Sequence, residues 1–449
     1  MSDLIVIGGG AAGWSGALAA AQRGLEVTLL EKLPDSGGSS ALSGGCLAFA
    51  GTDLQIAQGI ADSPDILFDD LREVGKDVND ESLVRAYCDA QLATYAWLND
   101  AGVRFSPVLE TASGQSLPRV HTVDPADMVR QLRMAAEATG LVAYRPNTSA
   151  TALVRDGSGC VTGVALAHGD IIDARSGVLI ASGGFARNAE LLERYAPHLA
   201  EAVFVAGAGS QGDGLLMARK LGADVRDMEF IKGTFGKHPT DETNDHSLQA
   251  VYKGAIAVNQ DGRRFVDESI SYKLLGDAVM AQPWHTAYQI MDQGIFDTGD
   301  NRVRILDFGR RLEEGLFYVA DSLAELAAQI EVDPETLEAT VSRYNASVDD
   351  GHDAEFGRKH LVHHFGALRK IETAPFYAYP STAVVFGTYC GLRIDRDARV
   401  LNMDGKVIPG LYAAGEVTGG FHGAAYMTGS ALGKAVVFGR LAVLGIAAR

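Results

Sequence analysis

The chain has 449 residues, 47% of them hydrophobic, and a formal net charge of −18 at pH 7. Its length exceeds one ordinary core, so we expect two domains. The acidic excess argues against nucleic acid or anionic membranes as partners, which attract clustered Lys and Arg, and no apolar run is long enough to span a bilayer.

The first predicted element is a buried strand at residues 4–7, indicated by the apolar run LIVI. The turn after it carries a G-x-G-x-x-G pattern, made by Gly8, Gly10 and Gly13. An alanine-rich helix ending near Gly24 and a second apolar strand at residues 25–30, closed by Glu31, complete the unit. Such a unit is typical of dinucleotide binding: the glycines admit a pyrophosphate, the helix N-terminus attracts it, and the acid can hold a ribose hydroxyl.

A second loop rich in glycine and serine, DSGGSSALSGG, occupies residues 35–45. Both NAD and FAD fit the N-terminal unit. A flavin that runs from the first glycine turn towards the domain centre would use the amides and hydroxyls of this second loop, whereas a nicotinamide enzyme would not need them. Two later stretches fit the same ligand, a strand ending in paired glycines at 177–185 and a glycine-rich run at 405–420.

The middle of the chain differs in composition and residue pattern from both ends. Residues 232–246 are polar and rich in turn formers, residues 321–352 have the spacing of an amphipathic helix, and apolar strand-like runs return at 382–386. We therefore expect a cap domain inserted between two parts of one domain. The predicted boundaries are 1–230 and 376–449 for the cofactor domain and 231–375 for the cap. A pocket between such domains is a usual place for a substrate.

Three histidines, His360, His363 and His364, lie close together in a polar stretch of the predicted cap. Histidine pairs can bind zinc. Neither a cysteine nor an acidic partner completes an obvious site, so a structural or solvent-facing role is favoured and no metal is expected.

The cysteines, at positions 46, 88, 160 and 390, are scattered and form no C-x-x-C-H haem motif. Unclustered thiols are typical of reduced cytosolic proteins. The first residues lead directly into a strand and leave no room for a signal peptide, so we expect a cytoplasmic protein.

Several segments resemble, in the same order, the signatures of the fumarate reductase-like flavoproteins, which include soluble fumarate reductases and 3-ketosteroid Δ1-dehydrogenases. Besides the N-terminal unit they are ASGGFARNAELLERYAP (181–197), GDGLLMARKLGA (212–223), VNQDGRRFVDES (258–269), APFYA (374–378) and IPGLYAAGEVTGG (408–420). The resemblance implies an α/β fold, a Rossmann-like FAD-binding domain of the GR2 type with an inserted α+β cap. It also implies FAD and an electron transfer that makes or saturates a C–C double bond beside a carbonyl-type group.

The resemblance also implies where the flavin is held. Glu416 resembles the acid that binds the ribityl chain, and residues 429–432 would begin the last helix, whose N-terminus stabilises negative charge on reduced flavin. Binding should be non-covalent, because residues 35–45 lack the histidine that carries covalent flavin in some members. The expected FAD-binding residues are Gly8, Gly10, Ala12, Gly13, Glu31, Lys32, Gly38, Ser39, Ser40, Ser43, Gly44, Gly45, Ala181, Ser182, Gly183, Asp213, Gly415, Glu416, Ser430, Ala431 and Leu432.

Two positions separate the chemistries within this family. Fumarate reductases keep one arginine a few residues after RFVNE and another in the last glycine-rich segment, where this chain has Tyr272 and Tyr426. A phenol cannot form the bidentate, charge-assisted pair that arginine makes with a carboxylate. Ketosteroid dehydrogenases use a tyrosine at the first position as base, and a second tyrosine with a backbone amide to polarise the ketone. Gly429 resembles that amide, and a gapless count places Ala425, beside Tyr426, at the second tyrosine.

We therefore expect an FAD-dependent dehydrogenase that desaturates a cyclic ketone, either a steroid or a smaller oxo-cyclohexane acid. Tyr272 would take the α-proton, the β-hydride would pass to flavin N5, and Tyr426 with the Gly429 amide would hold the enolate oxygen. Further candidates for substrate contact are His238, Tyr389 and His422. The alternatives are an ene-reductase of the fumarate or urocanate type, and a flavoprotein that only carries electrons or assists assembly. The electron acceptor would be a quinone, oxygen or a carrier protein.

Overall fold

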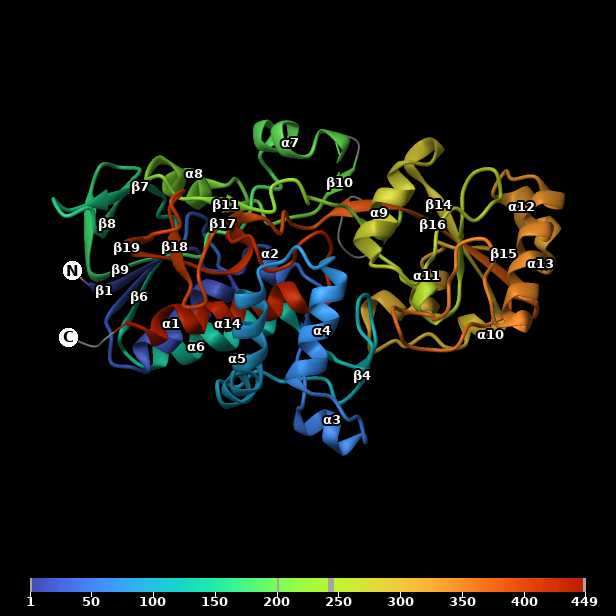
Figure 1. Ribbon diagram of the computed structural model, residues 1–449, viewed down its shortest axis with the longest axis horizontal. Coiled ribbons are helices and arrows are strands. Elements are labelled where there is room, and N and C mark those ends of the chain that lie inside the picture. Colours follow the sequence, from blue (N-terminus) through green and yellow to red (C-terminus); the bar gives the residue numbers. More distant parts are fainter. Residues whose placement is uncertain (1, 200–201, 241–245, 447–449) are drawn as a thin grey trace.

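The computed structural model describes residues 2–199, 202–240 and 246–446. The chain forms two bodies side by side, with both termini at the end of the first body that faces away from the second (Figure 1). Part of the polar segment expected at 232–246, residues 241–245, lies outside the described residues. Within the described ranges, no helix combines the length and apolar character needed to cross a bilayer.

The first body is built on a sheet with the strand order β18-β19-β9-β1-β2-β6. Its strands are β1 (Ser2–Ile7), β2 (Val27–Leu30), β6 (Val142–Arg145), β7 (Ala150–Arg155), β8 (Val161–Leu166), β9 (Ile171–Ile180), β18 (Arg399–Leu401) and β19 (Val407–Ala413). Strand β1 pairs in parallel with β2 and β9, as crossover connections through helices require. The strand–helix–strand unit predicted at the N-terminus is thus present, and the last part of the chain returns to the sheet as β19, parallel to β9.

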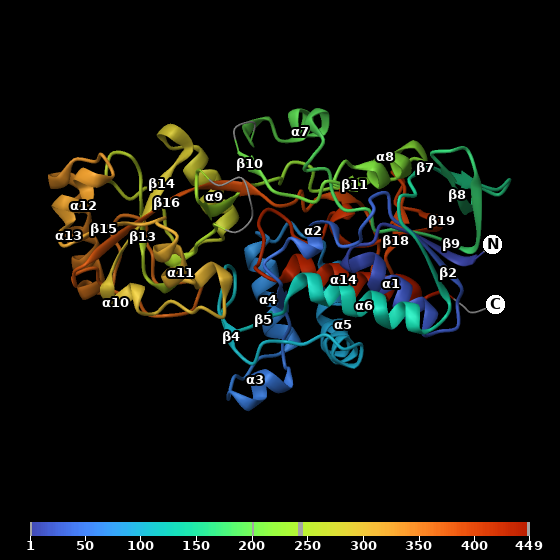
Figure 2. The ribbon, with the colours of Figure 1, turned by 180° about the vertical axis from the view of Figure 1, so that it is seen from behind.

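The first body also contains helices. They are α1 (Ala11–Ala21), α2 (Gly38–Ala41), α3 (Asp53–Ala57), α4 (Pro64–Val74), α5 (Glu81–Asp100), α6 (Pro125–Ala138), α7 (Ala189–Tyr195), α8 (Asp213–Lys220) and α14 (Ser430–Leu444). Helices α1, α6 and α14 lie side by side (Figure 2). The close fit of α14 on α1 depends on glycine, because a Cβ at Gly439 would lie 2.4 Å from the carbonyl oxygen of Ala12. This packing fixes where α14 begins, next to the cavity described below.

Two small sheets complete the first body, one made by β3 (Cys46–Ala48), β4 (Leu109–Glu110) and β5 (Val120–Thr122), the other by β11 (Val225–Arg226) and β17 (Gly391–Leu392).

The second body has its own sheet and core, as an inserted cap would. Its strands are β10 (Val203–Phe204), β12 (Thr234–Lys237), β13 (Ile256–Val258), β14 (Ala287–Asp292), β15 (Tyr318–Ala320) and β16 (Phe376–Val385). Its helices are α9 (Tyr272–Met280), α10 (Gln293–Phe296), α11 (Phe308–Glu313), α12 (Leu323–Gln329) and α13 (Pro334–Asp350).

Strand β16 is buried along its whole length and joins the two bodies. Its first part pairs with β14 and β15 inside the cap, and its last part pairs with β12 and with β10, at Val203 and Phe204. The apolar run predicted at 382–386 is the end of this strand. Strand β16 starts at Phe376, which pairs within the cap sheet, so the cap does not end sharply at residue 375. The domain boundaries at 231 and 375 stay a prediction.

The helical stretch expected at 321–352 is two helices rather than one. Helix α12 ends at Gln329, and α13 begins at Pro334 after Asp333, whose side chain accepts a hydrogen bond from the Thr336 amide. Proline favours the first turn of a helix and cannot continue a preceding one, which explains the break.

Candidate active site

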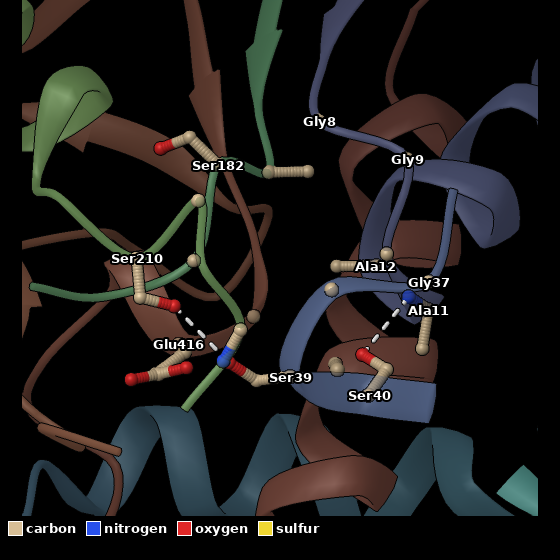
Figure 3. A pocket seen from close by; sticks show the side chains of 18 of the residues that line it. Gly8, Gly9, Ala11, Ala12, Gly37, Ser39, Ser40, Ser182, Ser210 and Glu416 are labelled. Atoms are coloured by element: carbon tan, nitrogen blue, oxygen red, sulfur yellow. Dashed lines mark hydrogen bonds between the residues drawn. The ribbon is translucent and has the colours of Figure 1, made fainter. Parts of the chain in front are cut away.

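A cavity lies at the carboxyl ends of the parallel strands of the first body. The residues that follow β1, β2 and β9, namely Gly8, Glu31 and Ala181, all line it. Figure 3 looks into this cavity, with the glycine turn on one side and Ser182, Ser210 and Glu416 on the other. The carboxyl edge of an open parallel sheet is where such folds bind ligands.

The glycine turn is sterically required. Gly8 has a φ of 110°, and a Cβ there would lie 2.4 Å from the carbonyl oxygen of Ala181. A Cβ at Gly13 would lie 1.9 Å from the carbonyl oxygen of Gly8. Glu31 braces the turn, since one carboxylate oxygen accepts a hydrogen bond from the Gly9 amide at 2.8 Å. Backbone amides at the start of α1 therefore face the cavity without side chains in the way.

The second glycine- and serine-rich loop lines the cavity beside the glycine turn (Figure 3). Its short helix α2 carries Ser40, whose Oγ accepts a hydrogen bond from the Ala11 amide at 3.1 Å (Figure 3). Ser39 Oγ accepts from the Gly207 amide at 3.0 Å and lies 3.1 Å from Ser210 Oγ. The loop thereby connects the first turn to the segment before α8. Lys32 and Asp213, both in the cavity lining, form an ion pair.

Most residues predicted to bind the cofactor line this cavity. They are Gly8, Gly10, Ala12, Glu31, Lys32, Gly38, Ser39, Ser40, Ser43, Ala181, Ser182, Gly183, Asp213, Gly415, Glu416, Ala431 and Leu432. Gly13, Gly44, Gly45 and Ser430 are outside the lining. Gly45 instead serves a tight turn, with a φ of 70° and a Cβ position 2.0 Å from the carbonyl oxygen of Val123. The part that each residue takes in binding remains a prediction.

Two charged residues, Glu416 and Lys434, lie in the lining of the cavity. Glu416 accepts a hydrogen bond from the Thr388 amide at 2.9 Å, and burial raises the pKa of its carboxyl. Lys434, on α14, donates to the carbonyl oxygen of Thr418 at 2.9 Å, and burial lowers its pKa to about 8. The charge of each residue partly offsets the effect of burial on the pKa of the other.

Beyond these charges lies an aromatic group that we call the tyrosine cluster, made by Tyr272, Tyr389, His422 and Tyr426. Ring centroids are 5.6 Å apart for Tyr272 and Tyr426, 4.9 Å for Tyr389 and Tyr426, and 5.5 Å for Tyr389 and His422. Tyr389 and His422 line the cavity. The Gly429 amide donates to the Tyr426 hydroxyl at 3.3 Å. The three residues predicted to be catalytic, Tyr272, Tyr426 and Gly429, are therefore neighbours. They are outside the cavity lining, which the cluster reaches through Tyr389 and His422.

Hydrogen bonds with the first body fix the position of Tyr272. It begins α9, and its amide donates to Ser113 Oγ at 3.0 Å. Ser271 Oγ donates to the carbonyl oxygen of Tyr426 at 2.9 Å. The Ser113 carbonyl also accepts from the Thr428 amide at 2.9 Å, so Ser113 fixes the cap helix relative to the glycine-rich segment.

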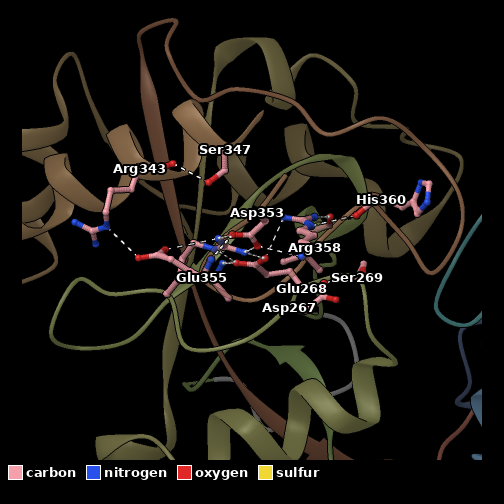
Figure 4. A network of polar contacts seen from close by, with 12 residues as sticks. Asp267, Glu268, Ser269, Arg343, Ser347, Asp353, Glu355, Arg358 and His360 are labelled. Atoms are coloured by element: carbon pink, nitrogen blue, oxygen red, sulfur yellow. Dashed lines mark hydrogen bonds and ion pairs between the residues drawn. The ribbon is translucent and has the colours of Figure 1, made fainter. Parts of the chain in front are cut away.

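A buried ionic network holds the segment that leads to Tyr272 (Figure 4). Arg264 makes paired hydrogen bonds to Glu268, at 2.9 and 2.8 Å, and to Asp353, at 3.0 and 2.9 Å. Arg358 donates to Glu268 at 3.2 Å and to the carbonyl oxygens of Val251 and Ala255. Such charges are tolerated in a core only when fully paired, as here. The RRFVDES motif is thus a structural brace for the turn before α9.

Burial sets the ionisation of the cluster. It raises the pKa of Tyr272 and Tyr389 well above the ordinary value, raises that of Tyr426 to about 12, and lowers that of His422 well below its usual value. At neutral pH the tyrosines therefore carry their protons, and the imidazole is uncharged.

Lys273 is a residue of this site that sequence reasoning missed. Its Nζ lies 4.4 Å from the ring centroid of Tyr389 and 5.9 Å from that of Tyr426, and donates to the carbonyl oxygen of Lys232 at 3.2 Å. Burial lowers its pKa to about 7. In the sequence, only its position directly after Tyr272 pointed to a place in the site, and a lysine in a helix is usually exposed to solvent.

His238, another candidate for substrate contact, is placed elsewhere. It follows β12 and packs edge-on against Tyr379, with ring centroids 5.4 Å apart, and its Nδ1 lies 3.0 Å from Thr240 Oγ1. Tyr379 belongs to the cap core. These contacts place His238 against the cap core, outside the cavity lining.

The cavity suits an extended dinucleotide. Helices α1 and α14 both begin at it after a glycine N-cap, so the positive end of each helix dipole faces the cavity and favours anionic or carbonyl groups there. Ser182 Oγ and His422 Nε2 are buried, line the cavity region, and find no hydrogen-bond partner among the described residues. Buried polar atoms of this kind usually have a partner, and a bound ligand would supply one.

Comparisons with known proteins agree with this geometry. The family described as FAD binding domain matches residues 3–432. The chain is 34% identical over 451 residues to a fumarate reductase (cytochrome) of Shewanella frigidimarina, covering 98% of this chain and 76% of that one. It is 29% identical to a 4-oxocyclohexanecarboxylate 2-dehydrogenase of Sinomonas cyclohexanicum, covering 93% and 87%. A solved 3-ketosteroid-Δ4-(5α)-dehydrogenase from Rhodococcus jostii RHA1, in complex with 4-androstene-3,17-dione, superposes with a TM-score of 0.79 at 26% identity, covering 100% and 97%.

Proposed function

Since the chain belongs to the FAD binding domain family and is an FAD-dependent oxidoreductase of the ene-reductase and dehydrogenase type, we propose that it desaturates a cyclic ketone. The ring is a steroid or a smaller oxo-cyclohexane acid. The expected family, fold and cofactor are confirmed, and the substrate is the proposal.

The observation that carries the proposal is the pairing of Tyr426 with Gly429 beside Tyr272. The Gly429 amide donates to the Tyr426 hydroxyl over a long 3.3 Å, so a ketone oxygen placed beside both would accept the hydroxyl proton and share the amide N–H. Such donors act on the charge that develops on the oxygen in the transition state, and one is worth about 3–4 kcal/mol. A ketone needs this arrangement, whereas a dicarboxylate is better served by arginines at the same positions.

Proton removal falls to Tyr272, which must then act as a phenolate. Its place at the N-terminus of α9 favours the anion, against the effect of burial on its pKa. As the α-proton moves to the Tyr272 oxygen, the C–H electron pair forms the enolate, which Tyr426 and Gly429 hold. The chemistry that FAD supplies when bound is acceptance of the β-hydride, which leaves the C–C double bond.

One observation favours the reverse direction, an ene-reductase of an α,β-unsaturated acid. With its pKa raised, Tyr272 holds a proton at neutral pH and suits a general acid that protonates the α-carbon. Lys273 offers a buried cation for one carboxylate. This second candidate has the support of the identity to a fumarate reductase.

An anaerobic titration separates these functions. Bleaching of the oxidised flavin by saturated cyclic ketones, with the dienone or enone as product, supports the dehydrogenase. Reoxidation of dithionite-reduced flavin by fumarate, urocanate or another α,β-unsaturated acid, without any bleaching by ketones, would replace it with the reductase. If neither occurs, and a carrier protein exchanges electrons rapidly, the chain is an electron carrier.

The remaining assignments follow the same proposal. The partner is a small molecule, and the electron acceptor is a quinone, oxygen or a carrier protein in the cytoplasm. The rates at which reduced flavin is reoxidised by each of the three, measured by stopped flow at equal concentrations, identify the acceptor.

A further inference from the structure

A group of possible metal ligands lies where the cap meets the first body, away from the cavity. Glu73 comes from α4, and His363 and His364 come from a cap turn. The sequence shows no acidic residue next to these histidines, but the fold supplies one from nearly three hundred residues away. We propose that Glu73, His363 and His364 bind a divalent transition-metal ion of the zinc type, and that the ion fastens the cap to α4.

The distances fit a zinc-type ion. The ligand atoms all lie within 4.8 Å of one another. His364 Nε2 is 3.0 Å from both Glu73 oxygens, and His363 Nε2 is 3.7 Å from Glu73 Oε2. Ligands about 2.1 Å from a tetrahedral zinc are about 3.4 Å apart, so the observed separations lie on both sides of the required value. Small side-chain rotations suffice, and water would complete the coordination.

The turn that carries the histidines places both rings on the same side. Neighbouring side chains normally diverge, but His363 has a φ of 48°, and Val362 and Phe365 close the turn with paired backbone hydrogen bonds of 3.0 and 2.7 Å. The two imidazole centroids are consequently only 4.1 Å apart. A left-handed backbone in a non-glycine residue is costly, and such strain is concentrated at functional sites.

His363 gives the second indication of a ligand. Its side chain is 12% exposed, and its Nε2 is buried without a hydrogen-bond partner among the residues that the structure describes. The neighbouring carboxylate of Asp70 is 3.9 Å away, too far for a hydrogen bond. A buried imidazole nitrogen with a free lone pair, aimed at two carboxylates, is the donor that a borderline-soft cation prefers.

The site is connected to Tyr272 from both sides. The His363 amide donates to the carbonyl oxygen of Ser269 at 2.9 Å, three residues before Tyr272. On the other side, Asp70, one turn before Glu73, accepts from Ser116, in the turn that contains Ser113. A cation that joins α4 to the cap turn therefore holds both segments that position Tyr272.

Zinc titration of the holoenzyme tests the proposal, after removal of any affinity tag and treatment with a chelator. Isothermal titration with Zn²⁺ should show one site per chain, weakened at least tenfold in both Glu73→Gln and His364→Ala. The matched control is His360→Ala, whose ring centroid is 6.1 Å from that of His364, and which should bind as the wild type does. Absence of stoichiometric binding, or equal loss in the control, overturns the site.

The fastening role has its own readout, which does not depend on activity. Zinc should reduce the iodide quenching of flavin fluorescence at least twofold in the wild type, because a fixed cap restricts access to the cavity. Glu73→Gln should show no such change at the same zinc concentration. Quenching unaffected by zinc in a protein that has bound it would show that the ion does not fasten the cap.

Discussion

Replacing Tyr272 by phenylalanine tests the proposed chemistry most directly. The substitution removes one hydroxyl. It keeps the ring, which packs on Tyr426, and it keeps the hydrogen bond from the backbone amide to Ser113 Oγ. The free energy of unfolding should therefore change by only about 1 kcal/mol, the usual net value of a single hydrogen bond. The variant should bind FAD and keep the visible spectrum of the bound flavin.

Catalysis should respond very differently. A positioned general base contributes roughly 10²- to 10⁴-fold, so anaerobic flavin reduction by the ketone should slow at least a hundredfold, and exchange of the ketone α-hydrogen with solvent deuterium should slow with it. Because burial raises the pKa of Tyr272, the wild-type rate should rise with pH from neutral into the alkaline range, and this rise should vanish in the variant.

Tyr344→Phe is the matched control. Tyr344 is a buried tyrosine of the cap core, and removing its hydroxyl should leave the rate of flavin reduction unchanged. If Tyr272→Phe reduces its flavin at a rate close to the wild type, Tyr272 is not the base, and the reasoning from its position fails.

Other expectations follow from the same site. Tyr426→Phe removes one of the two proposed oxyanion donors and should slow flavin reduction about 10²- to 10³-fold, with FAD affinity unchanged in a fluorescence titration. The pKa of Lys273 is about 7 in the folded protein and 10.5 as a free side chain, so between these pH values the unfolded chain binds more protons than the folded one. The free energy of unfolding, measured by urea titration, should therefore rise with pH across this window. Lys273→Met should abolish the rise. Arg358→Met leaves Glu268 buried with less compensation and should destabilise the protein by about 3–5 kcal/mol in the same titrations. Heat denaturation should release intact FAD into the supernatant, and flavin that remained on the polypeptide would contradict non-covalent binding.

The sequence predicted best what local geometry determines. Gly13 is required by a contact within the turn, with the carbonyl oxygen of Gly8, so the glycine pattern alone located the turn and the strands around it. Gly8 is required as well, but by a contact with Ala181 that the sequence could not show. Periodicity distinguished strands from helices, but it predicted one continuous helix where the chain forms two, the second beginning at Pro334.

What the sequence could not show depends on burial and on long-range contacts. Lys273 differs from a solvated lysine only because α9 turns it into the protein, where burial lowers its pKa. His364 meets Glu73 across 291 positions of the chain, and no spacing rule reaches so far. The pairing of the Gly429 amide with the Tyr426 hydroxyl depends on a left-handed Gly429 at the start of α14, a backbone detail that the glycine-rich segment permits but does not specify.

Strand β16 makes the cap and the flavin site mechanically dependent on each other. A cap joined only by loops would rotate without disturbing the cofactor domain. Here a single rigid strand is anchored in the cap core at one end, and four residues beyond its other end the chain reaches Tyr389, which lines the cavity with a φ of 54°. A rotation of the cap would move the end of β16 and, with it, Tyr389 relative to its neighbours His422 and Tyr426. Any such rotation would therefore change the access to the cavity and the aromatic wall of the site together.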